Sequence, residues 1–75
     1  MEDFRKYITF NPNIRFGKAC IIGTRITAAD ILSWLGSGMT NDEILADFPE
    51  LKKEHILAVL QFAAKRESII KTTAE

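Results

Sequence analysis

Three side chains suited to binding phosphate stand together at the expected start of the last helix: Lys52, Lys53 and His55. Each lysine there opposes the positive end of the helix dipole, at a cost of about 0.3 kcal/mol or more per charge. Phosphates of a nucleic acid would offset that cost by meeting both ammonium groups and the free N–H groups of the first turn. The pattern therefore predicts DNA binding by this turn, with a solvated surface turn as the alternative.

Lys65 and Arg66 stand near the end of the same expected helix, where they either cover a solvated face or add contacts to the DNA backbone. His55 is the only histidine, and without a cluster of other ligands beside it the sequence predicts no metal site. The sequence also contains no nucleophile with a base, no carboxylate pair and no Gly-rich phosphate loop. We therefore expect no catalytic residue and no cofactor, and a small enzyme is the least favoured function.

A second group of cations occupies the N-terminal third of the chain. Arg25 follows Gly23 at the corner between an apolar run and a helix start, and glycine permits the positive φ that such a sharp exit needs. One interpretation of Arg25 is an ion pair with a nearby carboxylate such as Asp30, and the other is a contact with a partner protein. The candidate partner-binding residues are Arg15, Lys18 and Arg25.

Short strands are expected before this corner. Residues 7–10 are β-prone, and residues 11–13, Asn-Pro-Asn, form a strong turn signal. Residues 14–16 alternate in polarity, and residues 19–22 form a short apolar run bounded by glycines. The sequence predicts two or three short strands in the N-terminal segment.

Two capping-box patterns open the first two expected helices. Thr27 is followed three residues later by Asp30, and Thr40 is followed by Glu43 at the same spacing. The first helix should end at the glycine-rich residues 36–38, and the second helix should be barely two turns long.

A longer third helix is expected after Leu51, because Pro49 ends the second one. The apolar periodicity predicts that this helix runs to about Glu67, and that residues 68–75 form a tail. The expected order is a packing helix, a short helix, a turn and a longer helix. This is the layout of a trihelical helix-turn-helix domain. Three-helix bundles that bind no DNA have the same layout, so this alternative stays open.

Size and composition limit the organisation of the chain. Its 75 residues make a single domain, 1–75, with a β-containing segment over 1–26, a helix-turn-helix body over 27–67 and a tail over 68–75. The predicted fold class is mainly α, a three-helix helix-turn-helix body with a short N-terminal β element. A chain this short buries only about 60% of its unfolded surface, so we expect a homodimer to which the N-terminal strands contribute.

Cysteine usage and hydropathy predict where the protein works. Cys20 has no second cysteine with which to form a disulfide, and its apolar neighbours indicate a small buried side chain. No apolar run approaches the roughly 18 residues needed to span a membrane, and the first residues lack the pattern of a signal peptide. We expect a cytoplasmic protein with no membrane partner.

Charge is zero in total but uneven along the chain. Residues 1–27 carry +3, residues 28–49 carry −4 and residues 50–75 carry +1. A neutral total argues against strong non-specific binding of nucleic acid. The asymmetry favours an oriented contact with a partner, or pairing of the charges inside the fold or across a dimer.

Several of these segments occur in the order that is typical of one family. They are Gly17-Lys18, Gly23-Thr24-Arg25-Ile26, Asp42-Glu43-Ile44-Leu45 and Phe48-Pro49-Glu50-Leu51. Over roughly Ile8 to Ala64, the chain resembles the family catalogued as domain of unknown function 433. The resemblance implies a small, often dimeric prokaryotic protein with a three-helix homeodomain-like or winged helix-turn-helix body. Members of the family look like VapB-type antitoxins. Such a protein is commonly paired with a PIN-like toxin, and the pair implies two tasks: holding that ribonuclease inactive and binding operator DNA.

The chain departs from the usual family pattern at three positions. Members generally have proline at the position of Ala19, arginine at that of Ile22 and a threonine cap at that of Lys52. Loss of an arginine weakens the corner as a basic contact surface, whereas the extra lysine strengthens the DNA interpretation of the last helix.

The leading functional prediction is therefore the antitoxin of a type II toxin-antitoxin pair, which binds a PIN-like toxin and operator DNA. The alternative is a dimeric protein-interaction module that has a helix-turn-helix shape and binds no DNA, and the zero net charge favours it.

Overall fold

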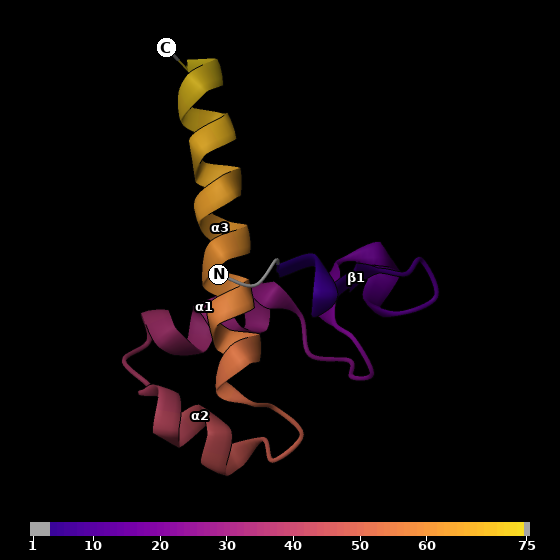
Figure 1. The fold of residues 1–75 in the computed structure, drawn as a ribbon, viewed down its shortest axis with the longest axis vertical. Coiled ribbons are helices and arrows are strands. Elements are labelled where there is room, and N and C mark those ends of the chain that lie inside the picture. The colour runs from indigo at the N-terminus through magenta and orange to yellow at the C-terminus, as the bar shows by residue number, and fades with distance from the viewer. Residues whose placement is uncertain (1–3, 75) are drawn as a thin grey trace.

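The fold is mainly helical, with one two-stranded antiparallel sheet. The computed structural model describes the backbone of residues 4–74 and the side chains of residues 4–67. The elements are, in order, η1 (Phe4–Lys6), β1 (Ile8–Phe10), η2 (Arg15–Gly17), β2 (Ala19–Ile21), α1 (Ala28–Gly36), α2 (Asn41–Asp47) and α3 (Lys53–Ala74). Helices α1 and α2 lie against the N-terminal half of α3, and the hairpin of β1 and β2 lies to the side (Figure 1).

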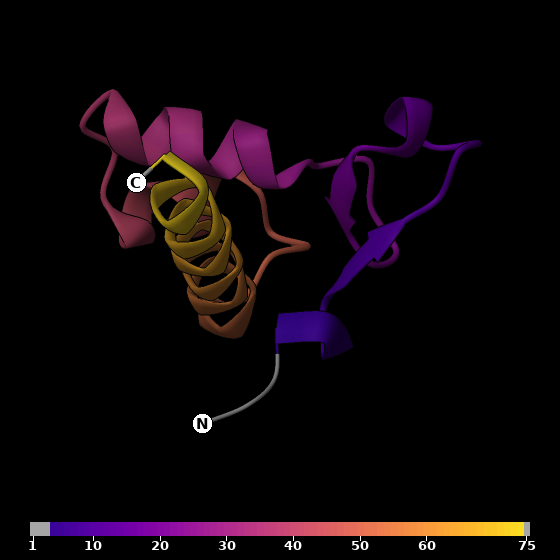
Figure 2. The ribbon, with the colours of Figure 1, turned by 90° about the horizontal axis from the view of Figure 1, so that it is seen from above.

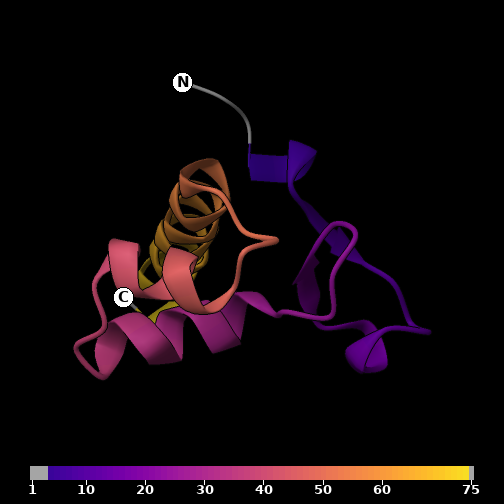
Figure 3. The same cartoon turned by 90° about the horizontal axis from the view of Figure 1, so that it is seen from below.

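Two short strands form within the segments 7–10 and 19–22, where the sequence predicts them, and they pair as a hairpin. Ile8 pairs with Ile21 and Phe10 pairs with Ala19, so that the β1 and β2 residues face one another in antiparallel register. Cys20, in the middle of β2, is 1% exposed, which confirms its role as a small buried side chain. Views along α3 from its two ends show that α1 connects the hairpin side of the molecule to the α2 side (Figure 2, Figure 3).

The prediction of a short strand over residues 14–16 is wrong. Arg15, Phe16 and Gly17 have φ values of 49°, 59° and 79°, all in the left-handed region, and form the turn η2. The guanidinium Nη1 of Arg15 donates to the carbonyl oxygen of Arg25 at 3.0 Å and lies 3.3 Å from Asp30 Oδ2. These contacts tie the hairpin loop to the start of α1, and they require a turn where local alternation suggested a strand.

Phe16→Asn is expected to stabilise the fold by about 1 kcal/mol. The left-handed conformation costs an ordinary L-residue roughly 1–2 kcal/mol, whereas asparagine adopts it readily. The ring of Phe16 is 96% exposed, so few contacts are lost with it. Thermal unfolding should shift upwards by roughly 4–8 °C. The neighbouring substitution Gly17→Ala, at φ 79°, should lower the melting temperature, and a lower melting temperature for Phe16→Asn would contradict the strain argument.

Both predicted capping boxes are present. The hydroxyl of Thr27 accepts from the Asp30 N–H at 2.9 Å, and the Asp30 carboxylate accepts from the Thr27 N–H at 3.1 Å. Thr40 and Glu43 make the same reciprocal pair at the start of α2. Because these bonds satisfy free donors of each first turn, the two helices start where the sequence predicts.

Helix α3 is longer than its periodicity indicates. It continues from Lys53 to Ala74, over most of the segment expected to be a tail. Its last turns project beyond the other elements (Figure 1). The side chains of residues 68–75, the segment predicted to be a tail, lie outside the described part of the structure.

A single core joins all the larger elements. One fully buried residue comes from each of β2, α1 and α2, and two come from α3. They are Ile21, Ile31, Ile44, Ile56 and Val59, each 0% exposed. The relative placement of the surface residues on α2 and α3 therefore depends on tight packing beneath them.

Candidate functional site

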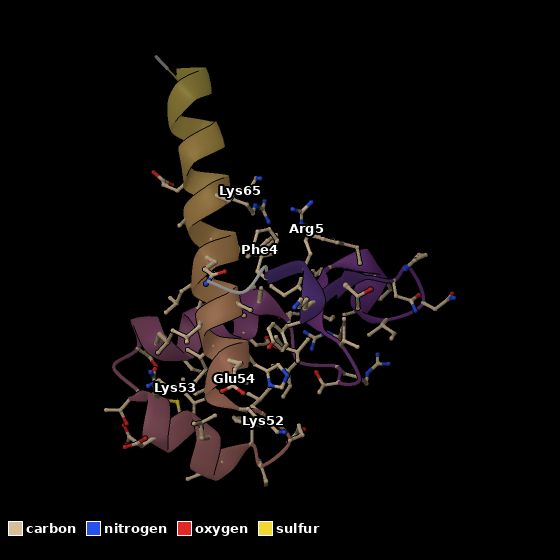
Figure 4. All side chains as sticks on the ribbon, viewed as in Figure 1. Phe4, Arg5, Lys52, Lys53, Glu54 and Lys65 are labelled. Atoms are coloured by element: carbon tan, nitrogen blue, oxygen red, sulfur yellow. The ribbon has the colours of Figure 1, made fainter. Side chains whose placement is uncertain are left out.

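The connection between α2 and α3, residues 48–52, places two lysines on the surface. Phe48 closes α2, and its ring stacks on Trp34 of α1 with centroids 4.3 Å apart and planes 10° from parallel. Leu51 is only 4% exposed, so the connection is anchored at both ends. Lys52 and Lys53 follow immediately, both exposed, at the lower end of α3 in Figure 4. The structure thus presents two consecutive exposed cations at a fixed helix start.

His55 has a structural contact in this turn. Its ring Nδ1 accepts a hydrogen bond from the Lys52 backbone N–H at 2.9 Å. The backbone N–H of His55 donates to the Lys52 carbonyl oxygen, also at 2.9 Å. The ring also packs edge-on against Tyr7, with centroids 5.5 Å apart. An accepting Nδ1 requires the proton of the neutral ring on Nε2. His55 therefore acts as the capping side chain of α3, and only its remaining edge is available to a ligand.

The cap predicts a stability that depends on pH. Partial burial lowers the pKa of His55 from its ordinary 6.5, an effect that Glu54 opposes and Lys52 reinforces. The unfolded chain then takes up the proton more readily than the folded one, so the cap's contribution is present above pH 6.5 and lost as pH falls through the lowered folded value.

His55→Gln keeps an accepting side chain at the same capping position and removes the titration. Urea unfolding between about pH 7.5 and about pH 5 should show a larger loss of stability for the wild type than for this variant. Carboxylates shared by both proteins cancel in the comparison. Parallel pH profiles would show that the cap does not respond to protonation.

The other two predicted DNA-binding residues lie elsewhere. Lys65 follows Lys53 by twelve residues, which is about 18 Å along a helix axis. Figure 4 shows Lys65 near Phe4 and Arg5, well away from Lys52 and Lys53. Arg66 lies over the ring of Phe62, 5.5 Å from its centroid. The structure does not bring Lys65 and Arg66 together with the cations at the start of α3.

The three predicted partner-binding residues also separate. The hairpin loop lies against the start of α1, and Arg15 from this loop pairs with Asp30. The interpretation that paired Arg25 with Asp30 is therefore wrong. The side chain of Arg25 is exposed, and within residues 4–67 no ion pair includes it. Lys18 is exposed and lines a hollow together with Arg66.

That hollow belongs to a feature missed in the sequence. Two adjoining hollows, of about 550 Å³ and about 320 Å³, share Phe10, Phe62 and Arg66 between the hairpin and α3. We call them together the Phe10–Phe62 groove. Phe10 remains 60% exposed although its ring lies 6.0 Å from that of Phe62. The only signal in the sequence was an aromatic residue at the end of a strand, which on its own indicates a core position.

Two other kinds of site are absent from the described residues. Within residues 4–74, no helix has the length and apolar character needed to cross a membrane. Over the same part of the chain, no three His, Cys, Asp or Glu side chains are grouped so that they could hold a metal ion.

Comparison with known proteins places the chain in a family. No curated protein matches it. A crystal structure of a DUF433 member protein from Anabaena variabilis is similar, with 28% sequence identity and a TM-score of 0.76, over 91% of this chain and 68% of the other. Residues 8–63 match the family described as protein of unknown function DUF433. This match covers most of the chain, and the protein therefore belongs to the DUF433 family.

Proposed function

We propose that this protein is the antitoxin of a type II toxin-antitoxin pair, acting in the cytoplasm as a homodimer that binds operator DNA and a PIN-like toxin. The observation that carries the DNA part is the exposed pair Lys52 and Lys53 at the first turn of α3. In this proposal α2, the connection and α3 act as a helix-turn-helix, and α3 is the helix that enters the major groove.

The local chemistry at this turn supports phosphate binding. The Lys52 backbone N–H is capped by a neutral imidazole, so no carboxylate stands at the position where Thr27 and Thr40 each pair with one. Glu54 adds one exposed acid next to two exposed bases. The end of the helix therefore keeps a positive excess, which favours phosphate oxygens over other ligands.

The homodimer rests on the size of the core and on what α3 leaves uncovered. Leu57 and Leu60 are 45% and 42% exposed on the outer face of α3. The two-stranded sheet also has edges to which a second copy could add. Burial of these surfaces in a dimer would supplement a small core.

A gel-shift titration of the protein's own upstream DNA, with and without the product of the adjacent gene, tests the proposal across a salt series. A protein that neutralises several phosphates should lose affinity steeply between about 50 and 200 mM salt. A sequence-selective shift that sharpens with the partner is expected. No shift at any salt, together with no complex with that gene product, would refute the proposal.

The second candidate is a dimeric protein-interaction module without a DNA role. The Phe10–Phe62 groove and the zero net charge favour it. It predicts a stable complex with the adjacent gene product and no shift of upstream DNA at low salt. The same titration therefore separates the two functions.

A further inference from the structure

The Phe10–Phe62 groove has an apolar floor in which the ring of Phe10 is 60% exposed and that of Phe62 is 8% exposed. The Phe62 ring stands between those of Phe4 and Phe10, with centroid distances of 5.7 Å and 6.0 Å. Leu32 and Ala63 continue the floor towards α1. A phenylalanine that is 60% exposed over a continuous hollow is a favourable place to bury an apolar side chain of another molecule.

The rim of the groove is basic. Lys18 and Arg66 line the larger hollow, and Arg5, Lys65 and Arg66 line the smaller one. Glu67 lines the larger hollow and is the one acidic residue among the linings of the two hollows. Lys18, Lys65 and Arg66 around an apolar floor complement a ligand that carries acidic groups beside an apolar stripe.

A second copy of this chain offers no such ligand in its described part. Helix α2 carries the acids Asp42, Glu43 and Asp47, but the exposed large hydrophobic residues of 4–67 all lie outside it. Outside the groove these exposed residues are Phe16, Ile22, Leu57 and Leu60. Helix α3 carries the exposed Leu57 and Leu60, but its exposed charges are mixed: Glu54 and Glu67 together with Lys53, Lys65 and Arg66. Within residues 4–67, no helix of this chain therefore combines an exposed apolar stripe with an acidic polar face, which the groove requires on one segment.

We propose that the Phe10–Phe62 groove binds an amphipathic helix with an acidic polar face, supplied by a different protein. The docking follows the helix-in-groove mode, in which apolar side chains spaced three and four residues apart meet the floor. Acidic side chains of the same helix meet Lys18, Lys65 and Arg66 at the rim. The inference rests on the part of the proposed function in which this chain binds a partner protein, and it names the surface and chemistry of that contact.

The test uses three fluorescein-labelled peptides of about 20 residues, long enough to form a helix. The first has Leu at helical spacing and Glu at the remaining surface positions. The second replaces each Glu by Lys. The third is the first peptide with prolines introduced at central positions to prevent a helix. Fluorescence anisotropy with the full-length protein should show binding of the first peptide, at least about tenfold weaker binding of the other two, and a loss of affinity with added salt.

Variants then locate the bound peptide. Phe10→Ser removes an exposed ring from the floor, and Lys18→Glu with Arg66→Glu reverses the rim; each should weaken binding at least about tenfold. Phe16→Ser is the matched control, because it removes an even more exposed phenylalanine outside the groove. Circular dichroism of every variant measures whether the fold is retained, and sedimentation measures whether the oligomeric state is retained.

Three outcomes would overturn the inference. These are equal binding of the acidic and basic peptides, unchanged affinity in the groove variants, and conversion of a dimer into a monomer by Phe10→Ser. The last result would show that a second copy covers the groove. If the peptides fail while the adjacent gene product still binds and the upstream DNA still shifts, the groove assignment falls and the antitoxin function stands.

Discussion

Replacement of both Lys52 and Lys53 by Glu is expected to abolish the salt-dependent shift of operator DNA while the fold stays intact. Both side chains are exposed, and acids at a helix start interact favourably with its dipole, so stability should not fall. If each lysine contacts one phosphate, each single Lys→Glu change should weaken binding about uniformly across sequences and lower the salt slope by about one. The double variant should lose at least about tenfold in affinity.

The matched control reverses the same number of charges on the same helix. Lys65→Glu with Arg66→Glu alters net charge as much as the first variant, but its site lies about 18 Å further along α3. Gel shifts with the upstream DNA should retain most of the wild-type affinity. Equal losses in the two double variants would mean that overall charge, and not the first turn of α3, determines DNA binding.

Ile56→Ala should destabilise the protein by about 2–5 kcal/mol, a large part of the roughly 5–15 kcal/mol available to a small domain. Ile56 is 0% exposed and lies in the core shared by β2, α1, α2 and α3. Truncation leaves a cavity that close packing does not refill. Because this core holds α2 against α3, the variant should also lose DNA and partner binding when it unfolds near growth temperature.

The adjacent residue provides the control. Leu57 lies one position along the same helix and is 45% exposed, so Leu57→Ala should cost far less than Ile56→Ala in urea unfolding of the monomer. If α3 contributes to a homodimer, the same variant should lower the dimer's concentration-dependent stability. Similar losses for the two variants at concentrations where the protein is monomeric would contradict the observed burial.

Local rules were sufficient wherever a feature depends on residues a few positions apart. The caps at Thr27 and Thr40, the end of α2 before Pro49 and the hairpin with buried Cys20 all appear as predicted. Each depends on bonds or dihedral preferences within one turn or one strand pair. The sequence also places Lys52 and Lys53 correctly at an exposed helix start.

Prediction failed where distant parts of the chain compete for one partner. Asp30 is closer in sequence to Arg25 than to Arg15, but the fold of the hairpin brings Arg15 to it. That contact holds residues 15–17 in a left-handed turn, which alternation of polarity cannot reveal. The end of α3 was missed for a different reason, since the apolar periodicity that predicts a helix weakens after Glu67 although the helix continues to Ala74.

The sequence by itself therefore determined the order and the starts of the three helices, the two short strands before them and the charge carried by each segment, because these depend on short-range hydrogen bonds and periodicity. Only the tertiary structure decided which cations act together. It separated Lys65 and Arg66 from the start of α3, gave His55 to the cap, and placed Lys18 with Arg66 around Phe10 and Phe62. Proximity between segments far apart in the chain follows from the packing of one shared core, which no local pattern encodes.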